Sequence, residues 1–583
     1  QDVKTKGFDQ VMEEMAYNWF NRFIALRFME VNGYLPSGVR ILSSKESKSV
    51  EPDVFREITN VHKALNLDLN KVFELQDAGN SEELFKHLII AQCNALHEIL
   101  PFMFEPLNDY SELLFPDNLL VEDSVIRQMI ATIDESQWEE VEIIGWLYQF
   151  YVAEKKDEVF AGLTGRNKIS KEDIPAATQL FTPKWIVQYM VENSLGHLWQ
   201  ESHPESEVSS QLRYYLEPVE QEPEVQQKLD SLKDPNLTPE DITVMDPACG
   251  SGHILVYAFD LLEKIYLEQG YLAHEIPTLI LKHNLFGLEI DDRAAQLASF
   301  ALMMQARKSD PNIFRKGILP NIISIQESAG IKESFLYTRL DKESKRITDD
   351  LINAYKDAKN LGSILNPEIS NLDVFTQRLA VLKEQDRGLA EHDKDNLLRL
   401  QTLIDQTRLL NKKYDVVVTN PPYMGSRNMN ASLTEYLRDT YPTSRRDLFA
   451  VFMARMHDLT KSYGYHVTVT MQSWMFLSSF EKFRLEILEN YSIVGLTHMA
   501  NMVMGIAFGT SATILRKNVL GIKGTYQYVD LDDLQDNTPI EFPVINKRYS
   551  TVAATNFRAI PGSPIAYWVS DRIVQLFKDG QFL

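Results

Sequence analysis

Four consecutive residues, Asn420-Pro421-Pro422-Tyr423, combine groups that could bind and orient a flat ligand carrying an amine. The side chain of Asn420 offers an amide oxygen as a hydrogen-bond acceptor. Each proline fixes its own φ and has no backbone N–H, so the carbonyl groups of the turn stay available to a ligand. Tyr423 adds a flat aromatic face for stacking. The alternative is a plain proline turn in which Asn420 bonds its own backbone.

A buried strand is predicted directly before this turn. Three β-branched apolar residues, Val416-Val417-Val418, are typical of a short strand covered on both faces. The two prolines end that strand, because neither can donate to a ladder. We therefore expect Asn420 at the carboxyl end of a central parallel strand, where open α/β sheets bind their ligands.

A second strand, loop and helix pattern spans residues 242–255, and its loop reads Asp246-Pro247-Ala248-Cys249-Gly250-Ser251-Gly252. The two glycines permit positive φ and a close approach of the backbone to a ligand. A dinucleotide-binding loop is the standard rival. Against that rival, Val256 stands near the place of the third glycine, and a leading acid suits an amino-acid ammonium better than a pyrophosphate.

Two acids are predicted at the ends of the next two strands. Glu289 closes the apolar run 285–291, where a carboxylate can accept both hydroxyl groups of a ribose. A helix-capping acid is the alternative for this residue. Glu327 closes the run 322–328. Between residues 330 and 411 the sequence is charged and helical in period, which predicts a helical insertion before the strand that leads to Asn420.

Asn420 to Tyr423 resemble motif IV of the amino-methyltransferases that act on adenine in DNA. In that family the Asn side chain and the first proline carbonyl accept from the exocyclic amine, and the tyrosine stacks on the extruded base. Asp246 to Gly252 resemble motif I, in which Asp246, Pro247, Ala248, Gly250 and Gly252 would bind S-adenosylmethionine. Phe181-Thr182-Pro183 resemble motif X, which closes over the methionine end of this cofactor, and Thr182 is predicted to cap the helix that follows.

The same resemblance assigns the remaining site residues. Glu289 matches the ribose-binding acid of motif II, and Ile290 would pack on the cofactor's adenine. The family usually has an aspartate after the third strand; this sequence departs from that pattern, and Glu327 is the best match. Phe508, in the place of motif VIII, is predicted to pack against the flipped base, with a core phenylalanine as the alternative. Three arginines are predicted to contact phosphates, unless they form a solvated face: Arg427, Arg445 and Arg446.

The order of these motifs is that of the γ-type N6-adenine methyltransferases, and the resemblance covers about residues 179–515. Residues 23–36 and 179–194 are similar to the PglX family, the methylase of BREX phage-defence systems. The resemblance implies an α/β fold, the Rossmann-like class I methyltransferase domain, with a mostly parallel seven-stranded sheet and helices on both faces. It also implies N6 methylation of a flipped adenine in double-stranded DNA.

Five segments are predicted along the chain. A helical N-terminal domain (1–170) shows apolar residues at a helical period: Phe8, Met12, Met15, Trp19, Phe23, Leu26 and Met29. It precedes the cofactor-binding half (171–329), the helical insertion (330–411), the catalytic half (412–520) and the start of a C-terminal target-recognition domain (521–583). The chain begins at Gln1 and ends within a predicted helix, so we expect a fragment of a longer protein.

Composition bounds the class of protein. The 583 residues carry a net charge of −23 and only two cysteines, which exclude a disulfide framework and fit a reducing cytoplasm. No apolar run is long enough to span a bilayer, and no metal-ligand motif is visible. An acidic chain argues against a simple DNA-coating protein, but residues 411–520 carry 12 Lys+Arg against 8 Asp+Glu, so this catalytic segment can still engage DNA.

Two other functions remain open from the sequence. The first is the methylase part of a type IIG or type I-like restriction-modification enzyme with its nuclease elsewhere; the letters Glu154-Lys155-Lys156 fit a nuclease pattern but lie in a predicted helix. The second is a defence scaffold that binds cofactor and DNA without turnover. Double-stranded DNA and other phage-defence proteins are the expected partners, and no membrane is expected.

Overall fold

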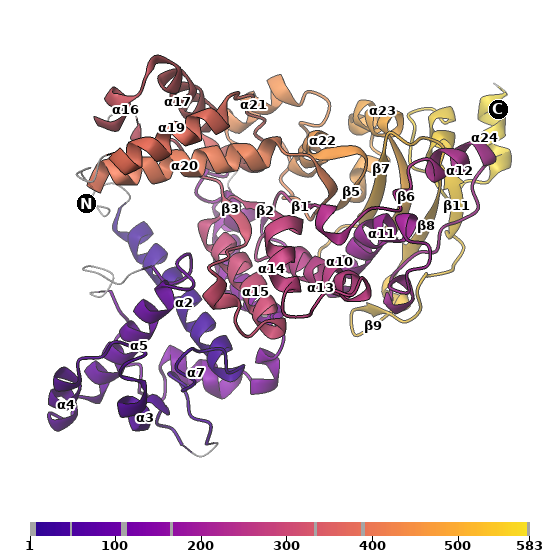
Figure 1. Ribbon diagram of the computed structural model, residues 1–583. Coiled ribbons are helices and arrows are strands. Elements are labelled where there is room, and N and C mark those ends of the chain that lie inside the picture. The colour runs from indigo at the N-terminus through magenta and orange to yellow at the C-terminus, as the bar shows by residue number, and fades with distance from the viewer. Residues whose placement is uncertain are drawn as a thin grey trace. The chain divides into compact units, whose positions relative to one another are not determined.

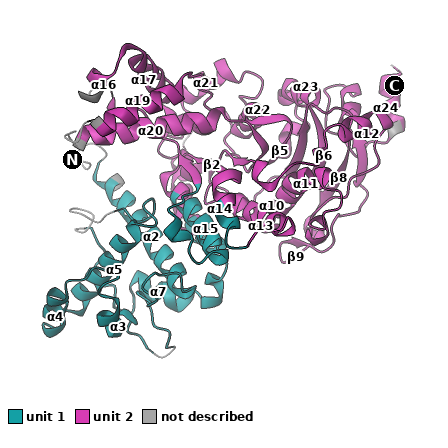
Figure 2. Cartoon of the chain, viewed as in Figure 1, with its two compact units in different colours: residues 1–148, 273–278, 296–320 teal, residues 149–272, 279–295, 321–583 magenta. Residues whose placement is uncertain are grey.

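The computed structural model describes residues 7–46, 49–105, 114–163, 167–331, 335–385 and 391–579. Two compact units divide the chain (Figure 2). Unit 1 comprises residues 1–148, 273–278 and 296–320, and unit 2 comprises residues 149–272, 279–295 and 321–583. None of the helices in the described ranges is long and apolar enough to cross a bilayer.

Unit 1 is helical in its described part. Its main helices are α2 (Phe8–Val31), α3 (Val54–Val61), α4 (Leu69–Asp77), α5 (Ser81–His97) and α7 (Val125–Thr132). The apolar stripe predicted for α2 is only partly buried: Phe8 is 64% exposed and Met12 is 38% exposed, so this part of the prediction was wrong. From Asn21 to Glu30 every residue of α2 is buried, on all sides of the helix.

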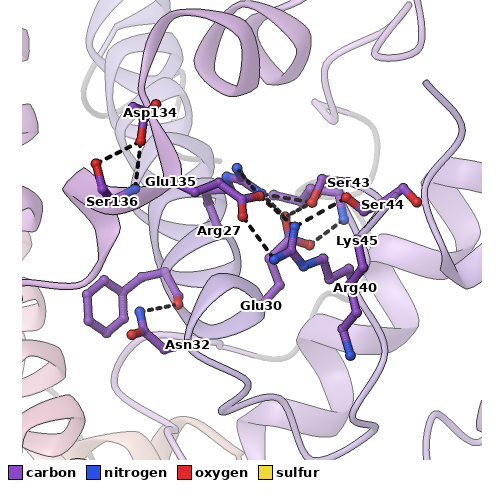
Figure 3. A network of polar contacts seen from close by, with 12 residues as sticks. Arg27, Glu30, Asn32, Arg40, Ser43, Ser44, Lys45, Asp134, Glu135 and Ser136 are labelled. Atoms are coloured by element: carbon purple, nitrogen blue, oxygen red, sulfur yellow. Dashed lines mark hydrogen bonds and ion pairs between the residues drawn. The ribbon is translucent and has the colours of Figure 1, made fainter. Parts of the chain in front are cut away.

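A buried polar network closes around the end of α2 (Figure 3). Arg27 and Glu30 form an ion pair of 2.8 Å while almost wholly buried. Glu30 also accepts hydrogen bonds from the backbone N–H groups of Ile41 and Leu42, at 2.9 and 2.8 Å. Glu135 Oε1 accepts a hydrogen bond from Arg27 Nη2 at 3.1 Å. The network thus fastens the loop that follows α2 to the helix itself.

A nine-stranded sheet organises unit 2 (Figure 1). Its order is β11-β8-β6-β7-β5-β4-β1-β2-β3, and chain order reverses between β1 and β4. β7 is antiparallel to both of its neighbours, and β11 is antiparallel to β8; every other pair is parallel. The strands are β1 (Val244–Asp246), β2 (Leu285–Glu289), β3 (Asn321–Ser324), β4 (Tyr414–Thr419), β5 (Thr460–Met471), β6 (Tyr491–Met499), β7 (Thr510–Lys517), β8 (Lys523–Val529) and β11 (Ser550–Ala553).

Helices cover both faces of this sheet, as predicted. One face carries α10 (Lys184–Val191) and α13 (His253–Glu268), and the other carries α20 (Glu391–Asn411) and α22 (Leu448–Leu459) (Figure 1). The core strands β1 and β4 are buried, which explains their short apolar runs. The predicted class I methyltransferase fold is therefore confirmed.

The sheet has two more strands than the seven predicted. β8 pairs in parallel with β6, and β11 pairs with β8, so residues 523–529 and 550–553 extend the same sheet. In the described residues the segment after 520 thus continues the catalytic sheet before it ends in α24 (Asp571–Lys578). Residues 580–582 of the predicted terminal helix lie outside the described residues. A role of residues 521–583 in target recognition stays a prediction.

The insertion between β3 and β4 is helical, as expected. It comprises α16 (Phe335–Arg339), α17 (Lys342–Tyr355), α18 (Ala358–Leu361), α19 (Leu372–Gln385) and α20. Leu351 of α17 and Leu403 of α20 share one buried apolar cluster with Met245 of β1 and Val417 of β4. The insertion therefore belongs to the core of the catalytic sheet and brings its own residues close to the carboxyl ends of β1 and β2.

Candidate active site

Asn420 follows β4 directly and lies beside β1, at the point where the strand order reverses. Its Nδ2 donates to Thr182 Oγ1 at 3.0 Å and more distantly to the Leu180 carbonyl at 3.4 Å. Its Oδ1 is buried and has no hydrogen-bond partner among the residues that the structure describes. An unpaired buried acceptor costs free energy, so a donor from a ligand would stabilise this position.

Thr182 does not cap the following helix. α10 begins at Lys184 with Pro183 in the capping position, and no side chain caps it. The Thr182 hydroxyl instead accepts from Asn420. The prediction of a helix cap was wrong, because a contact with a strand 238 residues further along the chain uses the hydroxyl. Phe181 packs edge-on against His253, with ring centroids 4.4 Å apart.

The glycine loop is joined to the end of β2 through Glu289. Gly252 has a φ of 90° and precedes α13, a conformation that favours glycine. The Gly250 N–H donates to Glu289 Oε2 at 2.7 Å. Glu289 Oε1 accepts from the N–H groups of Ile290 and Asp291, at 2.9 and 3.1 Å. Burial raises the pKa of the Glu289 carboxyl, and these three donors oppose the effect.

Asp246 is placed deeper than its neighbours in the loop. It is 1% exposed and accepts from Thr419 Oγ1 at 2.7 Å and from the Ala248 N–H at 3.0 Å. Burial raises the pKa of this carboxyl to about 7, and the two hydrogen bonds act in the opposite direction. Its contacts fasten β1 to β4, the strand that carries Asn420.

The raised pKa of Asp246 predicts a pH-dependent stability. Because this carboxyl binds its proton more tightly in the folded state, the free energy of unfolding of the protein falls as pH rises from the unfolded pKa of the group, near 4, to its folded pKa of about 7. We expect Asp246→Asn to remove roughly 2–4 kcal/mol of that loss. Urea unfolding of the ligand-free protein at pH 5 and pH 8 measures it. Equal pH dependence in parent and variant would contradict the assignment.

Tyr423 lies in an aromatic group after the proline turn. Its hydroxyl donates to the Val469 carbonyl at 3.0 Å, which fixes the ring. Its ring centroid is 6.2 Å from Phe449 and 6.1 Å from Phe508, the latter tilted by 52°. Phe508 is partly exposed and so is not a plain core residue. Tyr423 and Phe508 are near enough to contact one and the same base.

The turn is held from its other side by Asp447. This residue caps α22 and accepts from the Met424 N–H at 3.1 Å, while the Leu448 N–H donates to the Met424 carbonyl at 3.1 Å. Burial raises the Asp447 pKa to about 6. The three predicted phosphate contacts are exposed and lie within these loops: Arg427, Arg445 and Arg446. Their contact with DNA stays a prediction.

One cavity joins these parts, with about 730 Å³ of empty space when its open mouth is included. Predicted site residues on its wall are Pro247, Ala248, Gly250, Glu289, Ile290, Asn420 and Pro422. Predicted residues that are not on this wall are Phe181, Thr182, Pro183, Asp246, Gly252, Glu327, Pro421, Tyr423, Arg427, Arg445, Arg446 and Phe508. In the place of motif X, the wall consists of the residues just before it, including Thr178, Gln179 and Leu180.

Glu327 is held in an ion pair and is not among the residues that line this cavity. Lys171 Nζ lies 3.0 and 3.1 Å from its two carboxylate oxygens. Three parts of the wall were missed from the sequence: Ile174, Pro175 and Thr178; residues 360–364 of the insertion; and Leu448 and Phe452 of α22. The apolar period of α22 was visible in the sequence, whereas residues 360–364 carry no motif.

Comparisons with known proteins identify relatives of this chain. The model of the family described as Eco57I restriction-modification methylase matches residues 283–503. The adenine-specific methyltransferase BrxX of Escherichia coli O9:H4 (strain HS) is 39% identical over 99% of this chain and 50% of its own length. The adenine-specific methyltransferase PglX of Lacticaseibacillus casei (strain Zhang) is 36% identical, with the same coverage of both chains.

A distant structural likeness accompanies these relatives. The type IIL restriction-modification enzyme MmeI, solved in complex with DNA, is 14% identical, covers 92% of this chain and 57% of its own, and has a TM-score of 0.45. Because this likeness is distant, the fold is assigned from the strand order of the sheet in this chain. The chain spans about half the length of the curated relatives that it matches. Over 99% of its length it is a homologue of the adenine-specific methyltransferases BrxX and PglX, which confirms the resemblance to the PglX family.

Proposed function

We propose that this chain is the catalytic part of an adenine-specific DNA methyltransferase. Its substrates are S-adenosylmethionine and an adenine flipped out of double-stranded DNA, and the products are N6-methyladenine, S-adenosylhomocysteine and the proton that the amine loses. The buried, unpartnered Oδ1 of Asn420 on the cavity wall carries this proposal, since it matches the N–H donor that an exocyclic amine supplies.

The cavity also fits the proposed cofactor. Gly250 brings the backbone to the cavity wall without a side chain, and the Glu289 carboxylate beside it suits the two hydroxyl groups of a ribose. Ile290 adds an apolar surface for a purine. Bound there, S-adenosylmethionine would supply an electrophilic methyl group.

The contribution of the chain itself would be positioning and exclusion of water. Asn420 Oδ1 would accept one N–H of the target amine, and the Pro421 carbonyl would accept the other. Held in this way, the nitrogen lone pair is directed away from both acceptors. Thr182 Oγ1 keeps the Asn420 amide in one orientation through its bond to Nδ2. No covalent intermediate on the protein is needed.

A base in duplex DNA must leave its stack to reach Asn420, which costs a few kcal/mol. Stacking on Tyr423, with Phe508 beside it, would repay part of that cost. Arg427, Arg445 and Arg446 are exposed in the adjoining loops and would neutralise phosphates. The proposed role is self-marking in BREX phage defence, together with other defence proteins, in the cytoplasm where the DNA lies.

The test is DNA sequencing with detection of modified bases. DNA from cells that express the full-length protein, with any neighbouring defence proteins, is compared with DNA from cells that lack it. We expect N6-methyladenine in one short sequence motif. Unmodified DNA under these conditions would favour a binding scaffold without turnover. Cleavage of unmodified DNA by the purified full-length protein would instead identify a restriction-modification enzyme.

A further inference from the structure

The cavity wall near Glu289 and Ile290 has no carboxylate from β3. Glu327, the acid that follows β3, is paired with Lys171 and lies off the cavity wall. Its Oε1 also lies 3.4 Å from the Lys359 N–H. A ligand in this cavity would therefore meet a different polar group at this end.

Residues 360–364 of the insertion form that part of the wall. The segment packs its backbone directly on Ile290. Gly362 has a φ of +59°, and a Cβ added there would lie 3.4 Å from the Ile290 side chain. The insertion thus lies against Ile290, the residue on which a purine would pack, and both line the cavity.

Hydrogen bonds from several elements hold this segment in place. Lys359 Nζ donates to the Ile290 carbonyl at 2.8 Å, and Ser363 Oγ donates to the Pro247 carbonyl. The Ile364 carbonyl accepts from the Tyr441 hydroxyl at 2.7 Å. A wall fixed in this manner is preorganised and loses little freedom when a ligand binds.

Asn360 is a polar residue of this wall whose side chain is held by several hydrogen bonds. It is 4% exposed, and its Nδ2 donates to Asp357 Oδ2 at 3.0 Å and to Asn430 Oδ1 at 3.2 Å. Its Oδ1 accepts from Asn430 Nδ2 at 2.7 Å. An amide oxygen has two acceptor positions, and Asn430 occupies one of them. Asn360 is among the residues that line the cavity.

We propose that Asn360 Oδ1 accepts the exocyclic amine of the cofactor's adenine, so that the helical insertion selects the nucleobase of the cofactor. This inference rests on the proposed function, since it assumes an adenosyl ligand in this cavity. A 6-oxo purine presents an oxygen where adenine presents an amine. Two acceptors would then face each other, and a buried acceptor would lose its donor.

The test compares S-adenosylhomocysteine with S-inosylhomocysteine, which has an oxygen in place of the exocyclic amine and a proton on the neighbouring ring nitrogen N1. Calorimetric titration of the purified protein is expected to give at least about tenfold weaker binding of the inosyl ligand. Asn360→Leu, which has a similar volume and no acceptor, should reduce that ratio to about twofold or less. Glu327→Ala should retain the ratio of the parent protein, because its carboxylate lies off the cavity wall.

A second variant, Asn360→Ala, serves if the leucine variant does not fold, as judged by its thermal unfolding. Retention of the parent's ratio in a folded Asn360 variant overturns the proposal, and so does loss of the ratio in Glu327→Ala. A parent protein that binds the adenosyl ligand without preference also overturns it, while leaving the proposed function intact. A parent protein that binds neither ligand refutes the proposed function itself.

Discussion

Asn420→Ala is expected to slow methyl transfer to DNA by roughly 10²–10³-fold, while affinity for S-adenosylhomocysteine changes by no more than about threefold. The amide oxygen is buried and unpartnered, and Asn420 lines the cavity, so we expect its hydrogen bond to form when the target amine arrives. Its loss therefore affects the nucleophile rather than the cofactor. Single-turnover rates on unmethylated duplex DNA that contains the recognised sequence motif measure the rate of methyl transfer. Calorimetry measures the affinity for S-adenosylhomocysteine.

Thr182→Val provides the matched control for this variant. It removes the hydroxyl that orients the Asn420 amide at 3.0 Å but leaves the amide itself in place. We expect a smaller loss of rate, about tenfold, because the acceptor is present but less well held. Equal loss of rate and of cofactor affinity in Asn420→Ala would contradict the role of Asn420 as the group that positions the target amine.

The local parts of this site were accessible from the sequence. A run of three valines before two prolines can form little other than a buried strand with a turn at its end, and β4 is followed by that turn. The glycine loop and Glu289 are likewise set by neighbours in the chain, because each follows a short apolar strand. Patterns within about ten residues were sufficient for these elements.

The parts that were missed depend on contacts between distant segments. The Thr182 hydroxyl could have capped α10, and only the folded chain brings it to Asn420. Glu327 is an acidic residue after β3, as the site requires, but its carboxylate forms an ion pair with Lys171, which lies 156 residues earlier in the chain. Asn360 carries no motif, and its place on the cavity wall follows from the packing of the whole insertion on the sheet.

Glu30→Ala is expected to lower the free energy of unfolding by about 3–5 kcal/mol, a large fraction of the stability of a typical domain. Glu30 is 3% exposed and neutralises Arg27, which is 1% exposed (Figure 3). The variant would leave a buried guanidinium without its nearest carboxylate and would free the N–H groups of Ile41 and Leu42. Urea unfolding monitored by circular dichroism measures the change.

Glu135→Ala is the matched control, because it also removes a carboxylate that pairs with Arg27, but one that is half exposed rather than buried. Glu135 pairs with Arg27 at 3.1 Å and with Arg40 at 2.5 Å, but its side chain is 50% exposed, so water can replace much of what it supplies to either arginine. We expect the loss of each of these pairs to cost about 1 kcal/mol or less, even though both variants remove one carboxylate from Arg27. Similar costs for the two variants would mean that the ion pairs, rather than the desolvated backbone donors around Glu30, stabilise the end of α2.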